Sequence, residues 1–261
     1  MNRRISRRSL LLATLISGMS AAPQIANATV VEFQTVMGNF EVNLYDTTTP
    51  ITVTNFLSYV NNGNYTNSVF HRSVPGFIVQ GGGFSYEGVP GVLPAIPARP
   101  AILNEPILSN VTGTIAMAKF GNDPNSATNQ WFFNLADNSQ NLDLQNGGFT
   151  AFGEVVGNGM DVVNAIAALP RFNFGGASAE IPLQNYTPPA DFDANNLIII
   201  TAVIVTDSTA DSAGLAGLNP VVNTLINAPP PPPPATSGGG GGSFSFFALL
   251  GLLLTYRLRR A

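Results

Sequence analysis

The sequence contains no cysteine and, in 261 residues, only one histidine, His71. Without cysteine the chain cannot form disulfides, thiolate metal sites or a cysteine nucleophile. A single histidine also argues against a histidine-rich metal site and against a Ser-His-Asp triad. We therefore expect a function that requires neither a metal nor a cofactor, carried by other types of residue.

Positively charged residues are scarce in the middle of the chain. Of eleven lysines and arginines, four lie within the first eight residues and three within the last five. The other four, Arg72, Arg99, Lys119 and Arg171, share the middle with all fifteen acidic residues. A body this acidic would repel a phosphate backbone, so we expect no nucleic-acid partner.

Residues 1–28 have the pattern of an export signal. Four arginines precede an apolar run at 10–16, and Ala-Asn-Ala at 26–28 matches the small-residue site at which signal peptides are cleaved. The string SRRSLL at 6–11 resembles a twin-arginine signal, although a general-secretory signal with paired arginines would look alike. We expect an exported protein, by either route.

From residue 29 the sequence reads as a folded domain. Apolar and polar residues alternate over 31–35 and 40–44 on either side of Gly38-Asn39, which indicates a β-hairpin. Thr49 is placed to cap a helix, with Pro50 at its first position and Gly63 at its end. Many short strands with two helices predict a mainly β fold, a closed antiparallel barrel capped by the helices. The other expected elements are strands at 77–80, 114–118, 130–135, 150–156 and 197–205 and a helix at 160–169.

Two stretches rich in proline, glycine or asparagine interrupt this pattern, at 85–103 and 172–195, and we expect both to be surface loops. From residue 208 the composition changes again. The range 208–242 reads as a linker, with six consecutive prolines at 229–234 and five glycines at 238–242.

The last segment, 243–261, combines a short apolar stretch with three arginines. It resembles the glycine-glycine type of C-terminal sorting tail of Gram-negative bacteria, which a rhomboid-like membrane protease processes. A plain membrane anchor is the alternative, but thirteen apolar residues span only about 20 Å as a helix, against roughly 30 Å of hydrocarbon. The arginines place the tail's end in the cytoplasm and the body outside the inner membrane. We expect a periplasmic, envelope or cell-surface protein that is at least transiently held at that membrane.

One segment, FHRSVPGFIVQGGGF at 70–84, concentrates the chemistry. It sets His71 and Arg72 beside Phe77 and Ile78, with Gln80 and three glycines following. A fixed guanidinium beside a small apolar pocket suits a reaction that needs polarisation but no nucleophile. Four further segments follow in order, GTIAMA at 113–118, QWFFNLADN at 130–138, NLD at 141–143 and FTAFGEVV at 149–156.

Taken together, these segments resemble the cyclophilins, the barrel-shaped peptidyl-prolyl cis-trans isomerases, over residues 30–207. The resemblance implies a closed eight-stranded antiparallel barrel at 29–207 and a monomer that acts on proline-containing polypeptides. It implies that Arg72, Phe77 and Gln80 are catalytic. The residues that it implies for substrate binding are His71, Ile78, Ala118, Lys119, Gln130, Phe132, Leu142 and Phe149. Trp131, the only tryptophan, is expected to point into the core instead.

Two other functions remain open. The barrel could be a catalytically weak peptide-binding or chaperone module displayed at the cell envelope, or the scaffold of a structural surface protein. The presence of Arg72 favours catalysis, because a pure binder has no need of the arginine. Ile78 and Phe149 replace a methionine and a histidine that are frequent in the family, but both keep the pocket apolar.

Overall fold

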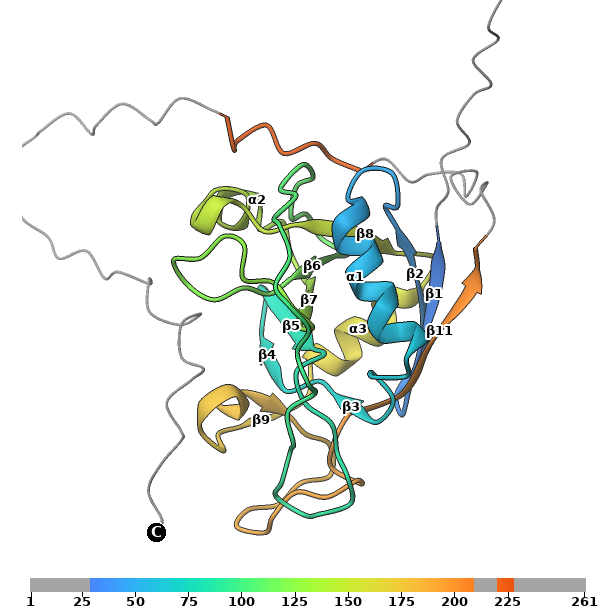
Figure 1. Ribbon diagram of the computed structural model, residues 1–261. Coiled ribbons are helices and arrows are strands. Elements are labelled where there is room, and N and C mark those ends of the chain that lie inside the picture. Colours follow the sequence, from blue (N-terminus) through green and yellow to red (C-terminus); the bar gives the residue numbers. More distant parts are fainter. Residues whose placement is uncertain (1–28, 209–219, 228–261) are drawn as a thin grey trace, which may run out of the picture.

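The computed structural model describes residues 29–208 and 220–227, which form a curled sheet with helices packed against it (Figure 1). The predicted signal peptide at 1–28 and the predicted sorting tail at 243–261 lie outside the described residues. Over the two described ranges, no helix combines the length and the apolar character that crossing a membrane requires.

Nine short strands form one antiparallel sheet in the spatial order β3-β11-β1-β2-β8-β6-β7-β5-β4. A separate two-stranded hairpin consists of β9 and β10. The strands are β1 Val30–Thr35, β2 Gly38–Leu44, β3 Ser68–Val69, β4 Arg72–Val74, β5 Ile78–Gly81, β6 Thr114–Met117, β7 Trp131–Asn134, β8 Ala151–Val155, β9 Arg171–Phe172, β10 Ile181–Pro182 and β11 Ile199–Asp207.

The two outermost strands of the sheet, β3 and β4, are consecutive in the chain, with only Phe70 and His71 between them. There the chain changes partners: the Phe70 N–H donates to the Ile198 carbonyl at 3.2 Å, and the His71 N–H donates to the Gln80 carbonyl at 3.1 Å. The mainly β, antiparallel prediction is confirmed. The closed eight-stranded barrel is not matched, because this change of partner divides one segment into two strands of a curled nine-stranded sheet.

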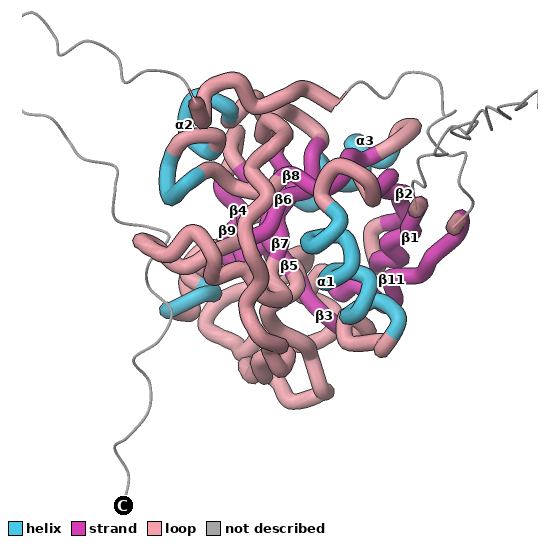
Figure 2. Tube along the Cα trace, turned by 45° about the horizontal axis from the view of Figure 1, so that its top comes forward, coloured by secondary structure: helices cyan, strands magenta, loops and turns pink. Residues whose placement is uncertain are grey.

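Both predicted helices are present, as α1 Pro50–Asn61 and α3 Gly159–Ala167. One short helix, α2 Ser139–Leu142, and two 3-10 turns, Gln145–Gly147 and Gly176–Ser178, complete the helical elements of the described ranges. Figure 2, which colours helices cyan and strands magenta, shows how much of the remaining chain is loop.

Thr49 occupies the N-cap position of α1, as predicted, but its side chain does not cap the helix. Its hydroxyl donates to the Tyr45 carbonyl at 3.3 Å instead of to the helix. The first N–H groups of α1, those of Ile51 and Thr52, donate to the carboxylate of Glu105 at 3.3 and 2.8 Å. A negative charge at a helix N-terminus is favoured by the helix dipole, so a carboxylate more than fifty residues away in sequence replaces the local cap.

Alternation along β5 and β7 separates two apolar clusters. Val79, Trp131 and Phe133 point into the main core, where Trp131 is fully buried and packs against other aromatic rings. Their neighbours Ile78 and Phe132 point to the opposite face of the sheet and belong to a second cluster. The predicted inward orientation of Trp131 is therefore confirmed, and a second, separate apolar cluster lies on the opposite face of the sheet.

The second of the two expected surface loops, 172–195, has more structure than the sequence indicates. It contributes the strand β10, and Ile181, Leu183 and Phe192 are buried in a third apolar cluster. The first, 85–103, is mostly exposed and lies beside it at the bottom of Figure 1, where the Gly91 N–H donates to the Phe192 carbonyl at 2.9 Å.

Residues 220–227, within the predicted linker, return to the barrel. The Ser109 N–H donates to the Val221 carbonyl at 2.7 Å, and the Asn223 N–H donates to the Ile107 carbonyl at 2.8 Å. The Asn223 side chain is buried and donates to the Asp143 carbonyl at 3.0 Å. The divisions at residues 28, 207 and 242 remain predictions, but this part of the chain is packed against the body.

Candidate functional site

Strands β4, β5 and β7 place Arg72, Gln80 and Phe132 in one row across the sheet. Arg72 lies opposite Gln80, and Gln80 lies opposite Phe132. Residues directly opposite one another on neighbouring strands point to the same face. The row continues to Ala116 on β6, which lies opposite Phe132. Residues that are up to sixty positions apart in sequence are thus set side by side outside the main core.

The apolar part of this surface is the second cluster. Four of the predicted substrate-binding residues are nearly inaccessible and form its base, Ile78, Phe132, Leu142 and Phe149. The rings of Phe132 and Phe149 meet edge to face, 5.9 Å apart. Phe77 is only half-buried and packs against the cluster from the turn between β4 and β5. The structure therefore brings together the apolar residues that the sequence named for the pocket.

A polar chain runs beside the apolar cluster. The Gln80 amide donates from Nε2 to Oε1 of Gln130 at 2.8 Å. An NH2 group of Arg72 approaches Oε1 of Gln80 at 3.5 Å, a weak hydrogen bond that can shorten when a substrate binds. The Arg72 side chain is 14% exposed, and its burial lowers the pKa of the guanidinium from its ordinary value. Because that value is so high, the group stays positively charged.

The three glycines after Gln80 are explained by close neighbours. A Cβ on Gly81 would lie 2.6 Å from the Trp131 ring, and one on Gly82 would lie 2.6 Å from both the Asn129 carbonyl and the Trp131 ring nitrogen. Gly83 differs, because a Cβ there would lie 2.8 Å from Cδ of the Gln130 side chain. Two glycines thus make room for the core, and the third makes room for a residue of the site.

We expect Gly83→Ala to lower the isomerase activity that the sequence resemblance implies about tenfold, while leaving the free energy of unfolding within roughly 1 kcal/mol. The Gln130 side chain can rotate away from the added methyl at little cost, but it then loses its hydrogen bond with Gln80. Rates on a proline peptide and urea unfolding of the same preparation test this. An active Gly83→Ala enzyme, or one that loses stability and activity together, would contradict the assignment.

His71, predicted to bind substrate, lies below the surface at 1% exposure, with its ring edge-on to Phe84 at 5.0 Å. Burial lowers the pKa of its imidazole to about 4, so the ring is neutral at neutral pH. Contact between this ring and a bound peptide stays a prediction.

Ala118 and Lys119 border the site on the loop after β6. The Ala118 N–H donates to the Gln130 carbonyl at 2.9 Å, which ties this loop to the polar chain. The Lys119 ammonium donates to the carbonyls of Asn146 and Gly148 at 2.9 and 2.6 Å and lies 4.7 Å from the centre of the Phe149 ring. Burial lowers the pKa of this ammonium to about 8. The Lys119 side chain therefore stabilises the loop that precedes Phe149. The predicted contact between the Lys119 backbone and substrate stays a prediction.

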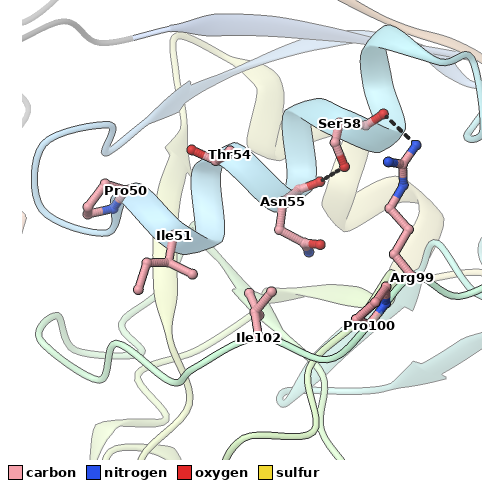
Figure 3. A pocket seen from close by; sticks show the side chains of 8 residues that line it. All are labelled: Pro50, Ile51, Thr54, Asn55, Ser58, Arg99, Pro100 and Ile102. Atoms are coloured by element: carbon pink, nitrogen blue, oxygen red, sulfur yellow. Dashed lines mark hydrogen bonds between the residues drawn. The ribbon is translucent and has the colours of Figure 1, made fainter.

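A hollow on another part of the surface holds none of the predicted site residues. It lies between α1 and the first insertion, and Figure 3 shows its lining. Its only charged group is the Arg99 guanidinium, which donates to the Ser58 carbonyl at 3.3 Å and lies 5.1 Å from the centre of the Tyr59 ring. We assign no chemistry to it. Within residues 29–208 and 220–227, no group of three or more histidine or acidic side chains could hold a metal ion.

Among the residues of the site that the sequence did not identify are Ala116 and Glu180. Ala116 belongs to the apolar cluster, and strand alternation from Ala118 would have identified it. Glu180 contacts the guanidinium, with Oε2 at 3.4 Å from Nε of Arg72. Nothing in the linear pattern indicates Glu180, which lies in a segment expected to be a loop.

Comparison with known proteins agrees with this geometry. Residues 30–187 match the family described as cyclophilin type peptidyl-prolyl cis-trans isomerase/CLD. The chain is 39% identical over 165 residues to a peptidyl-prolyl cis-trans isomerase of Acinetobacter baylyi, covering 63% of this chain and 85% of that protein. It is 42% identical over 143 residues to peptidyl-prolyl cis-trans isomerase B of Escherichia coli, covering 52% of this chain and 83% of that protein.

A solved structure shares the fold. The crystal structure of a cyclophilin-type isomerase from Cryptosporidium parvum superimposes with a TM-score of 0.51 and 23% sequence identity. The match covers 70% of this chain and 99% of that one.

Proposed function

We propose that Arg72 and the apolar cluster beside it form the active site of this chain, which belongs to the cyclophilin-type peptidyl-prolyl cis-trans isomerases and therefore catalyses rotation about Xaa-Pro bonds. We also propose that its substrates are exported proteins. The observation that carries the assignment is the row Arg72, Gln80 and Phe132, with a partly buried guanidinium beside the apolar cluster that Phe77 borders.

The reaction determines by how much the protein must lower the barrier to rotation. Rotation about the peptide bond crosses a barrier of about 18–20 kcal/mol, because the amide loses its resonance as it twists. A turnover of about 10³ per second needs a barrier near 13 kcal/mol. The protein must therefore supply roughly 5–7 kcal/mol, the difference between those barriers. No bond is made or broken, so neither a nucleophile nor a proton-transfer group is required.

Arg72 supplies part of this stabilisation. In the twisted state the prolyl nitrogen becomes pyramidal and carries a lone pair, which it lacks in the planar amide. A donor aimed at that nitrogen binds the transition state more strongly than the ground state. Hydrogen bonds to charged groups contribute about 1.5–3 kcal/mol, so the arginine alone is insufficient.

The apolar cluster supplies the rest. The half-buried Phe77, together with Phe132 and Leu142 in the cluster behind it, is placed to hold the proline ring out of water while the chain on the other side of the bond turns. Gln80 and Gln130 hold one another and offer amide groups to the peptide backbone. Polarisation and fixation together fit the magnitude that the reaction requires.

A protease-coupled isomerisation assay on the full chain tests this function. We expect turnover of Xaa-Pro peptides well above the uncatalysed rate. Binding of the peptides without acceleration would favour the second candidate, a peptide-binding or chaperone module. The arginine itself speaks against that candidate, because binding alone would not justify burying a guanidinium.

The proposal includes a place in the cell. The export signal at 1–28 and the tail at 243–261 support an exported protein of the Gram-negative envelope, held at the inner membrane at least transiently and processed by a rhomboid-like protease. We propose a monomer that meets its substrates outside the cytoplasm.

We expect the mature protein, isolated from its own host, to end within or beside the glycines at 238–242, because a thirteen-residue apolar stretch is too short for a lasting anchor. Intact-mass measurement of the C-terminus gives the answer. Replacing Arg257, Arg259 and Arg260 with serine should impair processing without changing isomerase activity. If the mature chain still ends at Ala261, the sorting-tail interpretation is wrong and the segment is a plain membrane anchor.

A further inference from the structure

The second insertion brings a carboxylate to the guanidinium of the proposed active site. Oε2 of Glu180 lies 3.4 Å from Nε of Arg72. The Glu180 oxygen is fully buried, and among the described residues it has no hydrogen-bond partner of its own. A buried carboxylate oxygen without such a partner is costly unless a charge compensates it. Here the compensating charge is Arg72.

The position of Glu180 is fixed by its surroundings. The Ser73 N–H, next to Arg72, donates to the Glu180 carbonyl at 2.8 Å. The following residue, Ile181, is fully buried and begins β10, which pairs with β9. This hairpin lies beside β4 in both views (Figures 1 and 2). The carboxylate is thus attached by its backbone to the same strand that carries the arginine.

The guanidinium is contacted from two sides. Glu180 meets it at Nε, and Gln80 lies 3.5 Å from one of its two NH2 groups. A guanidinium presents five donors in a rigid fork, so holding its Nε edge fixes the direction of the others. We propose that Glu180 is a positioning residue that holds Arg72 by its Nε edge and leaves the NH2 groups for the substrate. This inference rests on the proposed function.

Electrostatics support the same role. Burial lowers the pKa of the Arg72 guanidinium, and the nearby charge of Glu180 raises it. The carboxylate thereby offsets part of the cost of keeping a charged group in a partly closed site. An arginine without this partner would gain by turning out to solvent, where it cannot act on a bound peptide.

Kinetics of Glu180→Gln on the full chain test the proposal. The amide keeps the shape but not the charge, so we expect kcat to fall about tenfold with KM within about twofold, because orientation in the transition state is what is lost. Asp191→Asn is the matched control, an exposed carboxylate on the same insertion, and should leave both constants unchanged. Wild-type kinetics in Glu180→Gln would overturn the inference, whereas an inactive wild type would overturn the proposed function.

A second measurement does not depend on activity. In the wild type and in Asp191→Asn, the Nε–H of Arg72 should exchange slowly with solvent in nitrogen-15 NMR spectra, because an ion pair protects it. Arg72→Ala identifies the signal by its disappearance. In Glu180→Gln the exchange should be faster. Unchanged exchange would show that the carboxylate does not hold the guanidinium, even if catalysis falls for another reason.

Discussion

Arg72→Ala should reduce turnover of Xaa-Pro peptides about a hundredfold or more, the usual effect of removing a fixed donor that acts on developing charge. The loss should appear in kcat, since the donor meets its lone pair only in the twisted state. The fold should survive, because the Glu180 side chain is 33% exposed and can turn to water when its partner is gone. Turnover and thermal melting of the same preparation measure both effects.

Arg171→Ala serves as the control for Arg72→Ala, since it removes an exposed guanidinium from β9, outside the row. It should leave turnover unchanged. If Arg72→Ala retains activity within about threefold of the wild type, less than 1 kcal/mol in the barrier, the arginine is not the donor. A collapse of the melting temperature would instead assign Arg72 to the structure.

Gly82→Ala should destabilise the protein by roughly 3–5 kcal/mol. Gly82 has a φ of +77°, a left-handed conformation that costs alanine energy, and the new Cβ would lie 2.6 Å from the Asn129 carbonyl. Neither this backbone oxygen nor the Trp131 ring, packed in the main core, can move aside without disturbing the sheet. The measurement is the free energy of unfolding in urea.

Gly76→Ala is the matched control for Gly82→Ala. Gly76 has a similar φ of +66°, but a Cβ there would meet nothing within 4 Å. It should therefore lose only about 1 kcal/mol, the cost of the backbone conformation. Equal losses at the two positions would mean that strain, and not contact with the core, decides the stability of the three-glycine segment.

The sequence predicts the elements whose signals are local. Pro50 marks the start of α1, and alternation places Trp131 in the main core. The group that caps α1 cannot be predicted in this way, because the carboxylate of Glu105 comes from a segment that is distant in sequence. The strand count escapes it as well, because one segment changes partners at Phe70 and His71.

The same distinction applies to the site. Ordered motifs identify Arg72, Gln80 and Phe132, since the motif at 70–84 forms β4 and β5, the motif at 130–138 forms β7, and these strands pair in register. Their roles in catalysis remain predictions. Glu180 could not be identified, because its approach to Arg72 depends on how the second insertion folds over β4. Contacts made by insertions are decided by tertiary packing, for which no local pattern exists.

Residues 220–227 pack against the folded body and are the last residues of the chain that the structure describes. They lie not at the end of β11 but beside Asp143, whose carbonyl accepts a hydrogen bond from Asn223, next to Leu142 of the apolar cluster. In Figure 1 this orange-red segment runs past the end of the barrel that carries α2. If the tail is held at a membrane, as proposed, the described segment nearest to it in sequence, 220–227, borders the proposed active site.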